Sequence, residues 1–188
     1  PEKDPAKKDW TGVLNLGIGN NRILSVGLGE PGRIRFDRDI LEQRGLRAVI
    51  IFEAINDIGT SKAPDETSRQ LIEAYHVMIS KAKARGLKVY MGTITPFRGC
   101  KSYFTEEREK ARKVVNDWIR TTKEIDGFID FDALMRDPSE PEQLRKEWQS
   151  GDWLHPNPDG YKMMGEFAAK QLSKQATPGN SFSTVTVR

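Results

Sequence analysis

Short apolar runs alternate along this sequence with longer segments of helical periodicity. The apolar runs, which we expect to be strands, are residues 13–19, 48–55, 87–95 and 127–131. The helical segments are residues 33–43, 65–85, 105–123 and 159–175, and a polar connection covers residues 137–148. The run at 48–55 is almost continuously apolar, which is typical of a strand covered on both faces. Alternation of this kind builds right-handed βαβ units, so the sequence predicts an α/β fold with a parallel sheet flanked by helices.

The length of 188 residues fits one domain with a substantial core. We expect residues 1–12 to be a surface loop or the edge of a longer chain, residues 13–175 to be the domain, and residues 176–188 to be a tail. The formal net charge is +3, from 30 basic and 27 acidic residues that are interleaved, which argues against a nucleic-acid partner. No apolar run approaches the roughly 20 residues of a membrane span. The single cysteine, Cys100, excludes an intrachain disulfide.

A short loop at residues 151–160 carries one of the two histidines, His155, with Asp152 three residues before it. A carboxylate this close can fix the imidazole tautomer through one ring nitrogen and leave the other to take a proton from a hydroxyl. Prolines on both sides of Asn157 and the glycine at 160 restrict the loop. The alternative is a solvent-exposed loop with an incidental histidine. The other histidine, His76, is expected to be half-exposed on a helix.

Polar residues follow the expected strands where each strand ends. Gly19, Asn20 and Asn21 follow the first run, and Asn56 and Asp57 follow the second. Because the carboxyl ends of parallel strands meet at one edge of a sheet, chemistry in such folds gathers there. The sequence therefore predicts that these residues share one edge, which the Asp152–His155 loop joins before the last helix.

These segments resemble conserved blocks of the SGNH hydrolases, the GDSL-type esterase and lipase superfamily. Residues 15–22 resemble the second block, residues 53–57 the third and residues 152–156 the fifth, and the resemblance runs from about residue 13 to about residue 172. The family implies a flavodoxin-like three-layer sandwich and ester hydrolysis through a serine acyl-enzyme. It needs no cofactor and no metal.

The resemblance also implies roles for individual residues. His155 would be the general base and then the general acid, and Asp152 its orienting partner. Asn56 would donate its side-chain amide to the oxyanion, together with the turn at Gly19 and Asn20. The residues expected to lie against the substrate are Asn21, Asp57 and Trp153. Trp153 could stack on a sugar ring or pack the loop, and both alternatives stay open.

The chain departs from the family at two glycines. Asn20 stands where the second block has its oxyanion glycine, and Ala54 stands where the third block has glycine. Asn20 keeps its backbone N–H, and asparagine tolerates a left-handed backbone better than most residues do. Its side chain narrows the pocket. At Ala54 we expect one methyl group to fit.

The largest departure is that Gly-Asp-Ser, the family's nucleophile block, is absent from the 188 residues. In the family, that block follows a central strand between those corresponding to residues 13–19 and 48–55. An empty central position would leave a row of unpaired backbone groups, each costing roughly 1–3 kcal/mol when buried. We expect an upstream segment of the same protein to fill this position and carry the serine. The alternative is that residues 180–188 form a permuted strand, with Ser181 or Ser183 as nucleophile. Ser25 and Ser61 are expected to be ordinary loop residues.

The expected activity is therefore that of a serine esterase acting on a small acylated substrate. The resemblance is closest to a bacterial branch that includes sugar deacetylases, which implies acetyl removal from a carbohydrate and makes a secreted or periplasmic location an open possibility. The alternative is an inactive glycan- or partner-binding module on the same fold. A dinucleotide fingerprint at Gly17 and Gly19 lacks its third glycine. A metal site at Asp130 and Asp132 and a nucleophilic Cys100 are not favoured by the spacing of nearby residues.

Overall fold

The structure, a computed structural model, describes residues 12–175 of the chain. Three parallel strands form the sheet in the order β1 (Ala48–Ile51), β2 (Lys88–Gly92) and β3 (Gly127–Ile129). The register pairs Val49 with Val89 and Met91 with Phe128. The expected α/β fold with a parallel sheet is confirmed. The expectations for residues 1–11 and for the tail, including Ser181 and Ser183, lie outside the described residues.

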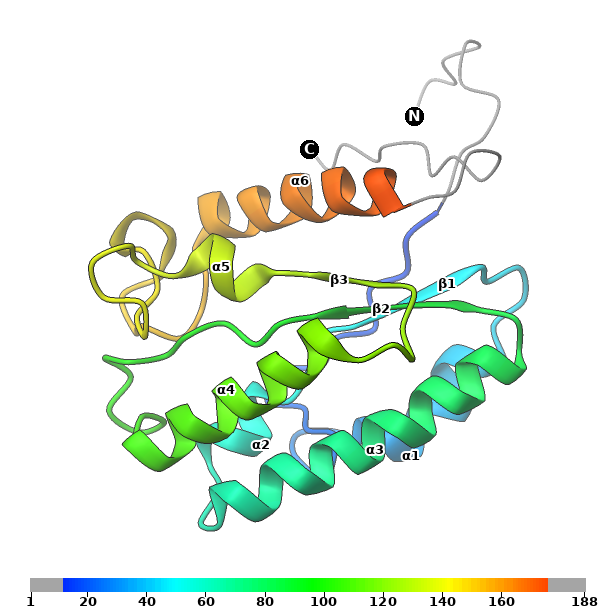
Figure 1. The fold of residues 1–188 in the computed structure, drawn as a ribbon, viewed down its shortest axis with the longest axis horizontal. Coiled ribbons are helices and arrows are strands. Elements are labelled where there is room, and N and C mark those ends of the chain that lie inside the picture. The colour runs from blue at the N-terminus through cyan, green and yellow to red at the C-terminus, as the bar shows by residue number, and fades with distance from the viewer. Residues whose placement is uncertain (1–11, 176–188) are drawn as a thin grey trace, which may run out of the picture.

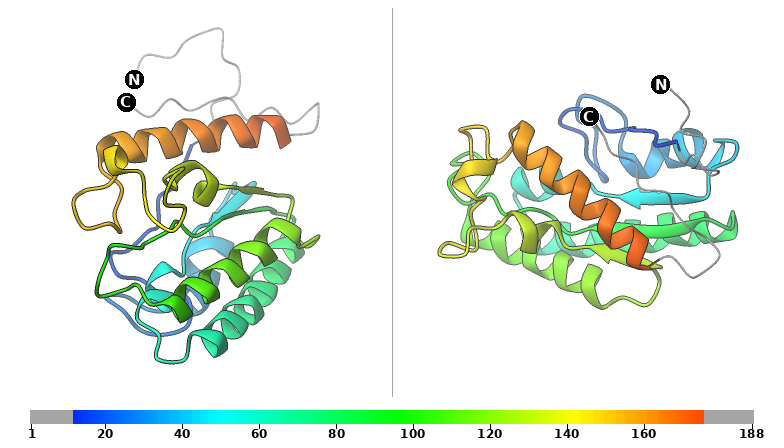
Figure 2. Two further views of the ribbon diagram at one scale, coloured as in Figure 1. Left: turned by 60° about the vertical axis from the view of Figure 1, so that its left-hand side comes forward. Right: turned by 90° about the horizontal axis from the view of Figure 1, so that it is seen from above.

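Helices cover both faces of the sheet, giving three layers (Figure 1). On one side lie α1 (Gly32–Phe36), α2 (Ile55–Gly59), α3 (Pro64–Ala84) and α4 (Glu106–Thr121). On the other side lie α5 (Phe131–Met135) and α6 (Pro158–Gln175), and α6 crosses over the sheet when seen from above (Figure 2). Two short turns of helix complete the fold, the π-helical η1 (Asp37–Leu41) and the 3₁₀-helical η2 (Lys146–Trp148). None of the helices within residues 12–175 combines the length and the apolar character needed to cross a membrane.

The long helices begin and end where the sequence indicates. The side chain of Thr105 accepts a hydrogen bond from the backbone N–H of Arg108 at 3.2 Å and caps α4, and acidic residues occupy the first turn, where the helix dipole favours them. Gly86, with φ 73°, follows the end of α3 in the left-handed region that glycine adopts easily. The large core between the sheet and α3 and α4 includes Leu71 and Val115, and a smaller core lies beneath α6.

The expected strand at residues 13–19 is wrong. The segment forms no strand, and its apolar side chains lie at the surface, with Val13 72% exposed. A strand needs a partner for its backbone groups, and none of the described strands pairs with this segment. The expected strand at 48–55 is shorter than predicted, because Ala54 adopts φ 108° and α2 begins at the next residue.

A groove lies between this segment and the outer edge of β1. Its volume is about 720 Å³, and residues 12–17 form one wall and residues 45–53 the other. Seen from above, the segment runs on the side of β1 that faces away from β2 (Figure 2). Among the described strands, β1 pairs only with β2, and the side chains of Ile50 and Phe52 are exposed. The sequence predicts that the strand carrying the nucleophile block, next to β1, is missing from the 188 residues. In the structure, this position beside β1 is a groove.

Candidate active site

One end of the sheet gathers the segments that follow the three strands. After β1 comes α2, after β2 the segment 93–105, and after β3 comes α5. The loop between α5 and α6 lies at the same end, on the left of Figure 1. This is the edge at which the sequence predicts the site.

The Asp152–His155 pair is formed. The imidazole Nδ1 of His155 lies 2.6 Å from Asp152 Oδ2, and Asp152 Oδ1 accepts the backbone N–H groups of Leu154 and His155 at 2.9 Å. Burial raises the pKa of Asp152, but the hydrogen bonds from His155 and Leu154 outweigh it and lower this pKa to about 2. The carboxylate is therefore ionised at neutral pH. The His155 side chain is 63% exposed, and within residues 12–175 its Nε2 has no hydrogen-bond partner, so this nitrogen is free to take a proton.

The loop that carries this pair is a tightly bent segment. Gly151 and Trp153 have φ 101° and 60°, both in the left-handed region, and the carbonyl of His155 accepts the backbone N–H of Ser150 at 2.9 Å. The Trp153 ring packs against Gly99, where an added Cβ would lie 2.6 Å from Trp153 Cγ. This contact fixes the loop to the segment that follows β2, and stacking of Trp153 on a sugar ring stays a prediction.

A turn at residues 18–21 forms the second part of the site. The backbone N–H of Asn21 donates to the carbonyl of Ile18 at 3.1 Å, and Asn20 has φ 53°. Asparagine occupies this left-handed position at lower cost than most residues, in line with the expectation for Asn20. The backbone N–H groups of Gly19 and Asn20 donate no hydrogen bond to any described residue, and both residues are exposed.

Asn56 lies directly on this turn. Its side-chain Nδ2 donates to the carbonyl of Asn21 at 2.9 Å, and its Oδ1 accepts the hydroxyl of Tyr103 at 2.8 Å. One N–H of the amide is used in this way, and the second has no acceptor among residues 12–175. The structure thus brings Asn56 and the turn together across 35 residues of sequence. The second N–H of the Asn56 amide and the backbone N–H groups of Gly19 and Asn20 have no acceptor among the described residues.

Asn21 and Asp57 are buried, and their polar atoms have protein partners. Asn21 is fully buried; its Oδ1 accepts two hydrogen bonds from Arg35 at 2.8 and 3.1 Å. Asp57 is 6% exposed, and its two oxygens accept the backbone N–H groups of Ile23 and Leu24 at 2.8 and 2.9 Å. Burial raises the pKa of Asp57, and these hydrogen bonds partly oppose the rise. The sequence predicts substrate contacts for both residues; in the structure their contacts hold the turn in place.

Ala54 fits sterically, as expected, but its backbone is unfavourable. The residue is fully buried and has φ 108°, a conformation that glycine adopts without penalty and that other residues rarely do. The chain therefore keeps the backbone that a glycine would favour while carrying a methyl group.

Two residues near the site were not identified from the sequence. Tyr103 belongs to the segment after β2 and has no motif around it. Glu53 lines the groove at the end of β1; burial, then the nearby charge of Asp57, raises its pKa to about 7 despite the opposing influence of Arg35. A carboxyl group at the first position of the third block is a sequence signal for Glu53, whereas the role of Tyr103 depends on the fold.

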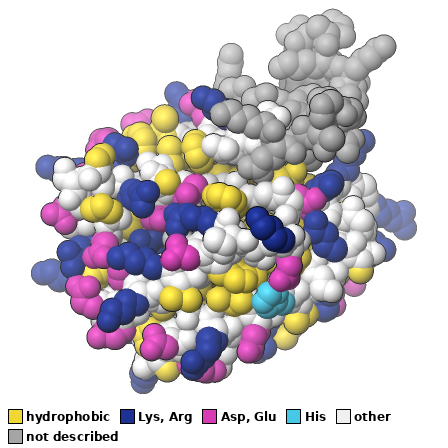
Figure 3. Space-filling view, in the orientation of Figure 1, with side chains coloured by type: hydrophobic (Ala, Val, Ile, Leu, Met, Phe, Trp, Pro, Cys, Tyr) yellow, Lys and Arg dark blue, Asp and Glu magenta, His cyan; other side chains and the backbone are white. Residues whose placement is uncertain are grey.

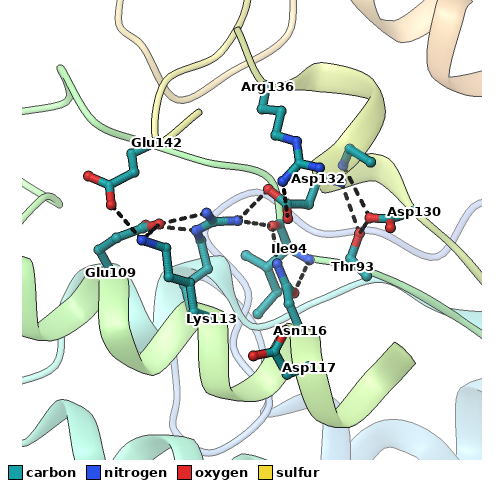
Figure 4. Close-up of polar contacts among 12 residues, drawn as sticks. Thr93, Ile94, Glu109, Lys113, Asn116, Asp117, Asp130, Asp132, Arg136 and Glu142 are labelled. Atoms are coloured by element: carbon teal, nitrogen blue, oxygen red, sulfur yellow. Dashed lines mark hydrogen bonds and ion pairs between the residues drawn. The ribbon is translucent and has the colours of Figure 1, made fainter. Parts of the chain in front are cut away.

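Asp130 and Asp132 are held by arginines behind the site. Arg112 Nη1 donates to Asp132 Oδ1 at 2.7 Å, and Arg120 reaches both carboxylates, at 2.7 and 2.6 Å. Figure 4 shows Asp132 turned into the network on α4, and Asp130 also accepts the backbone N–H of Ala133 at the start of α5. Within residues 12–175 there is no group of three or more side chains suited to hold a metal ion. On the face seen in Figure 3, basic and acidic side chains are interspersed rather than segregated.

Comparison with known proteins gives the family and supports the fold. The sequence model of the GDSL-like lipase/acylhydrolase family matches residues 3–163. Among solved structures, a GDSL-like lipase from Bacteroides thetaiotaomicron aligns with a TM-score of 0.62 and 19% identity over 77% of this chain and 70% of that one. A structure assigned to the acylhydrolases from Bacteroides fragilis aligns with a TM-score of 0.60 and 23% identity, over 76% of this chain and 68% of that one. A structure assigned to the G-D-S-L lipolytic proteins from Desulfitobacterium hafniense aligns with a TM-score of 0.57 and 24% identity, over 74% of this chain and 72% of that one. No curated protein matches the chain.

Proposed function

This chain belongs to the GDSL-like lipase/acylhydrolase family, and we propose that it is the larger part of a serine esterase that removes small acyl groups from a carbohydrate. The observation that supports the proposal is the common edge of the sheet. The His155 imidazole Nε2, one N–H of the Asn56 amide and the backbone N–H groups of Gly19 and Asn20 there have no hydrogen-bond partner among residues 12–175. These are a base and the donors of an oxyanion hole, the groups that acyl transfer requires.

The reaction follows from these groups. His155 Nε2 takes the proton of a serine hydroxyl as the serine oxygen attacks the acyl carbon, and Asp152 stabilises the imidazolium that forms. The negative charge on the former carbonyl oxygen is stabilised by the N–H groups of Asn56 and the 19–20 turn. The imidazolium then returns its proton to the departing sugar oxygen. Water repeats the sequence on the acyl-enzyme and releases the carboxylic acid and the serine.

The serine, in this proposal, precedes residue 13 in the natural protein. The groove along β1 supports this, because a strand placed there would satisfy the free edge of β1 and cover the exposed Ile50 and Phe52. A parallel strand in the groove would end at the same edge as β1, so a residue just after it would face the turn and Asn56. Other occupants, such as a second copy of the chain, would leave the site without this residue.

The substrate class forms part of the same proposal. Asn20 places a side chain at the oxyanion turn where the family has glycine, which favours a short acyl group such as acetyl. The exposed imidazole and the exposed turn favour a bulky, polar alcohol such as a sugar. Activity should therefore fall as the acyl chain lengthens from acetate to octanoate.

A non-catalytic binding module is the second candidate. The observation that favours it is Ala54, whose strained backbone marks a substitution in the block that carries the oxyanion amide. A module that lost its activity would tolerate this strain and would lack the upstream serine. It would bind acetylated oligosaccharide without turnover.

The test is ester hydrolysis by the natural full-length protein. We expect turnover of p-nitrophenyl acetate that His155→Ala lowers by roughly 10⁴ or more. His76→Ala is the matched control, because His76 is also an exposed histidine paired with a carboxylate, Glu124, and lies on α3. Equal rates for the wild type and His155→Ala would overturn the mechanism, and oligosaccharide binding without any turnover would favour the binding module.

A further inference from the structure

Among residues 12–175, the Asn56 side chain is hydrogen-bonded only to the 18–21 turn and to Tyr103, which belongs to the segment after β2. The Tyr103 hydroxyl lies 2.8 Å from Asn56 Oδ1, across 47 residues of sequence. The partners of the Asn56 amide decide which of its two end atoms is the oxygen and which is the nitrogen. The carbonyl of Asn21 can only accept, so the nitrogen of the Asn56 amide must face it, and the oxygen must face Tyr103. The phenol is therefore the donor.

The tyrosine ring is held rigidly. It packs so closely on Gly59 of α2 that an added Cβ there would lie 1.9 Å from Tyr103 Cδ1. Phe97 meets the ring edge to face at a centroid distance of 6.4 Å. Arg108 donates from Nη1 to the carbonyl of Tyr103 at 3.0 Å and from Nε to the carbonyl of Ser61, also at 3.0 Å. The hydroxyl is thus delivered to Asn56 by a side chain that has little freedom to move.

We propose that Tyr103 is a positioning residue that fixes the Asn56 amide in its oxyanion-binding orientation. This inference rests on the proposed function and extends it to a residue that touches neither substrate nor nucleophile. An asparagine amide turns easily about its last side-chain bond, which has broad preferences. With one donor fixed at its oxygen and one acceptor fixed at its nitrogen, the amide has a single satisfied orientation, in which the second N–H stays available.

The hydrogen bond from Tyr103 also makes the Asn56 amide a stronger hydrogen-bond donor. Donation into Oδ1 draws charge from the amide and makes its N–H groups more positive, an effect that low local dielectric increases. Burial raises the pKa of Tyr103, with Arg22 opposing the rise, so the phenol remains protonated at neutral pH. Tyr103 therefore acts as a donor at neutral pH.

The kinetic test is a double-mutant cycle in the natural full-length protein with p-nitrophenyl acetate. Tyr103→Phe should lower kcat by about 10-fold with little change in KM, because the interaction it supports forms in the transition state. Asn56→Ala should lower kcat by roughly 10²–10³. The double variant should match Asn56→Ala within about twofold, because Tyr103 has nothing to orient once the amide is gone. Tyr161→Phe is the control, since Tyr161 is 56% exposed on α6 and its phenol has no hydrogen-bond partner among residues 12–175.

Unchanged kcat in Tyr103→Phe, or multiplicative losses in the double variant, would overturn the inference. A second readout does not depend on turnover. In nitrogen–proton correlation spectra of the protein, Tyr103→Phe should shift or broaden the side-chain NH₂ signals of Asn56, and Tyr161→Phe should leave them unchanged. If the wild type proves inactive, the proposed function fails. These spectra then still decide the inference, because undisturbed Asn56 signals in Tyr103→Phe would refute it.

Discussion

The two halves of the candidate site are built in different ways. The half proposed to bind the oxyanion consists of buried and partly buried hydrogen bonds between residues 33 to 47 positions apart. Asp57 accepts hydrogen bonds from Ile23 and Leu24, and Asn56 joins Asn21 and Tyr103. The half that supplies the base is an exposed loop whose central hydrogen bonds span two to five residues.

Because of this difference, we expect substitutions in the two halves to affect stability and catalysis differently. Substitutions in the oxyanion half should disturb the fold and the reaction together, because the same buried groups serve both. Substitutions in the base loop should remove the reaction and leave the fold nearly unchanged, because the loop is exposed and locally hydrogen-bonded.

The largest expected effect is loss of catalysis without loss of stability in the base loop. Asp152→Asn can still accept the two backbone N–H groups through its oxygen, but it no longer stabilises the imidazolium or the productive tautomer. We expect kcat to fall by roughly 10³–10⁴ while the free energy of unfolding falls by about 1 kcal/mol or less. Kinetics and urea denaturation on the same preparation provide the measurement. A large loss of stability would show that the loop is coupled to the core.

The next effect is loss of stability in the oxyanion half. Asp57→Asn replaces one of two buried acceptors with an NH₂ group that faces a backbone N–H. We expect the free energy of unfolding to fall by about 2–4 kcal/mol and kcat to fall with it. Asp117→Asn on α4, with a side chain 75% exposed, is the control and should change stability by about 0.5 kcal/mol or less. If the Asp57→Asn variant were less stable but kept its kcat, the turn held by Asp57 would not take part in the reaction.

The halves should also differ in their response to pH. The folded-state pKa of Glu53 is raised to about 7 from 4.5, so folding favours its protonated form, and this contribution is lost as pH rises from about 4.5 through 7. We expect the described chain to lose roughly 1–2 kcal/mol between pH 5 and pH 8, and Glu53→Gln to remove most of that loss. Urea denaturation at the two pH values measures it.

The effect of Asp152 on the free energy of unfolding has the opposite sign and appears at lower pH. Its folded-state pKa is lowered from 3.8 to about 2, so its contribution is present above pH 3.8 and is lost as pH falls toward 2. The Glu53→Gln variant should leave this acid limb unchanged. If Glu53→Gln has the same stability difference between pH 5 and 8 as the wild type, another group is responsible.

The smallest effect concerns Ala54. Glycine at this position relieves the strain of φ 108° but loses a buried methyl group and makes the unfolded chain more flexible. We expect Ala54→Gly to raise the free energy of unfolding by about 1 kcal/mol or less, with kcat unchanged or slightly higher. Thermal denaturation measures it, and a clear loss of stability would mean that the methyl contact outweighs the strain.

The sequence predicts most of the fold and the base loop because those features are local. Helical periodicity and caps place α3, α4 and α6 within a few residues, and the spacing of Asp152 and His155 alone brings them together. The strand at 13–19 is predicted wrongly, because its composition fits a strand but its partner is not among the described residues.

The oxyanion half is less predictable for the same physical reason. Asn56 is identified through its block, whereas the burial of Asn21 and Asp57 depends on how the turn packs on α2. Tyr103 reaches Asn56 only because β2 lies beside β1, and no pattern around residue 103 indicates it. Contacts across more than 30 residues are a property of the fold rather than of any short motif.

The central claim is that the two halves act on a serine carried by a strand in the groove along β1. The direct measurement is to treat the natural full-length protein with a fluorophosphonate, which loses fluoride and becomes bonded to an activated serine oxygen, and to locate the adduct by mass spectrometry. The account predicts one adduct, on a serine that precedes residue 13, and no adduct in His155→Ala. An adduct on Ser25, Ser61 or another serine of the 188 residues, or none at all, would contradict it.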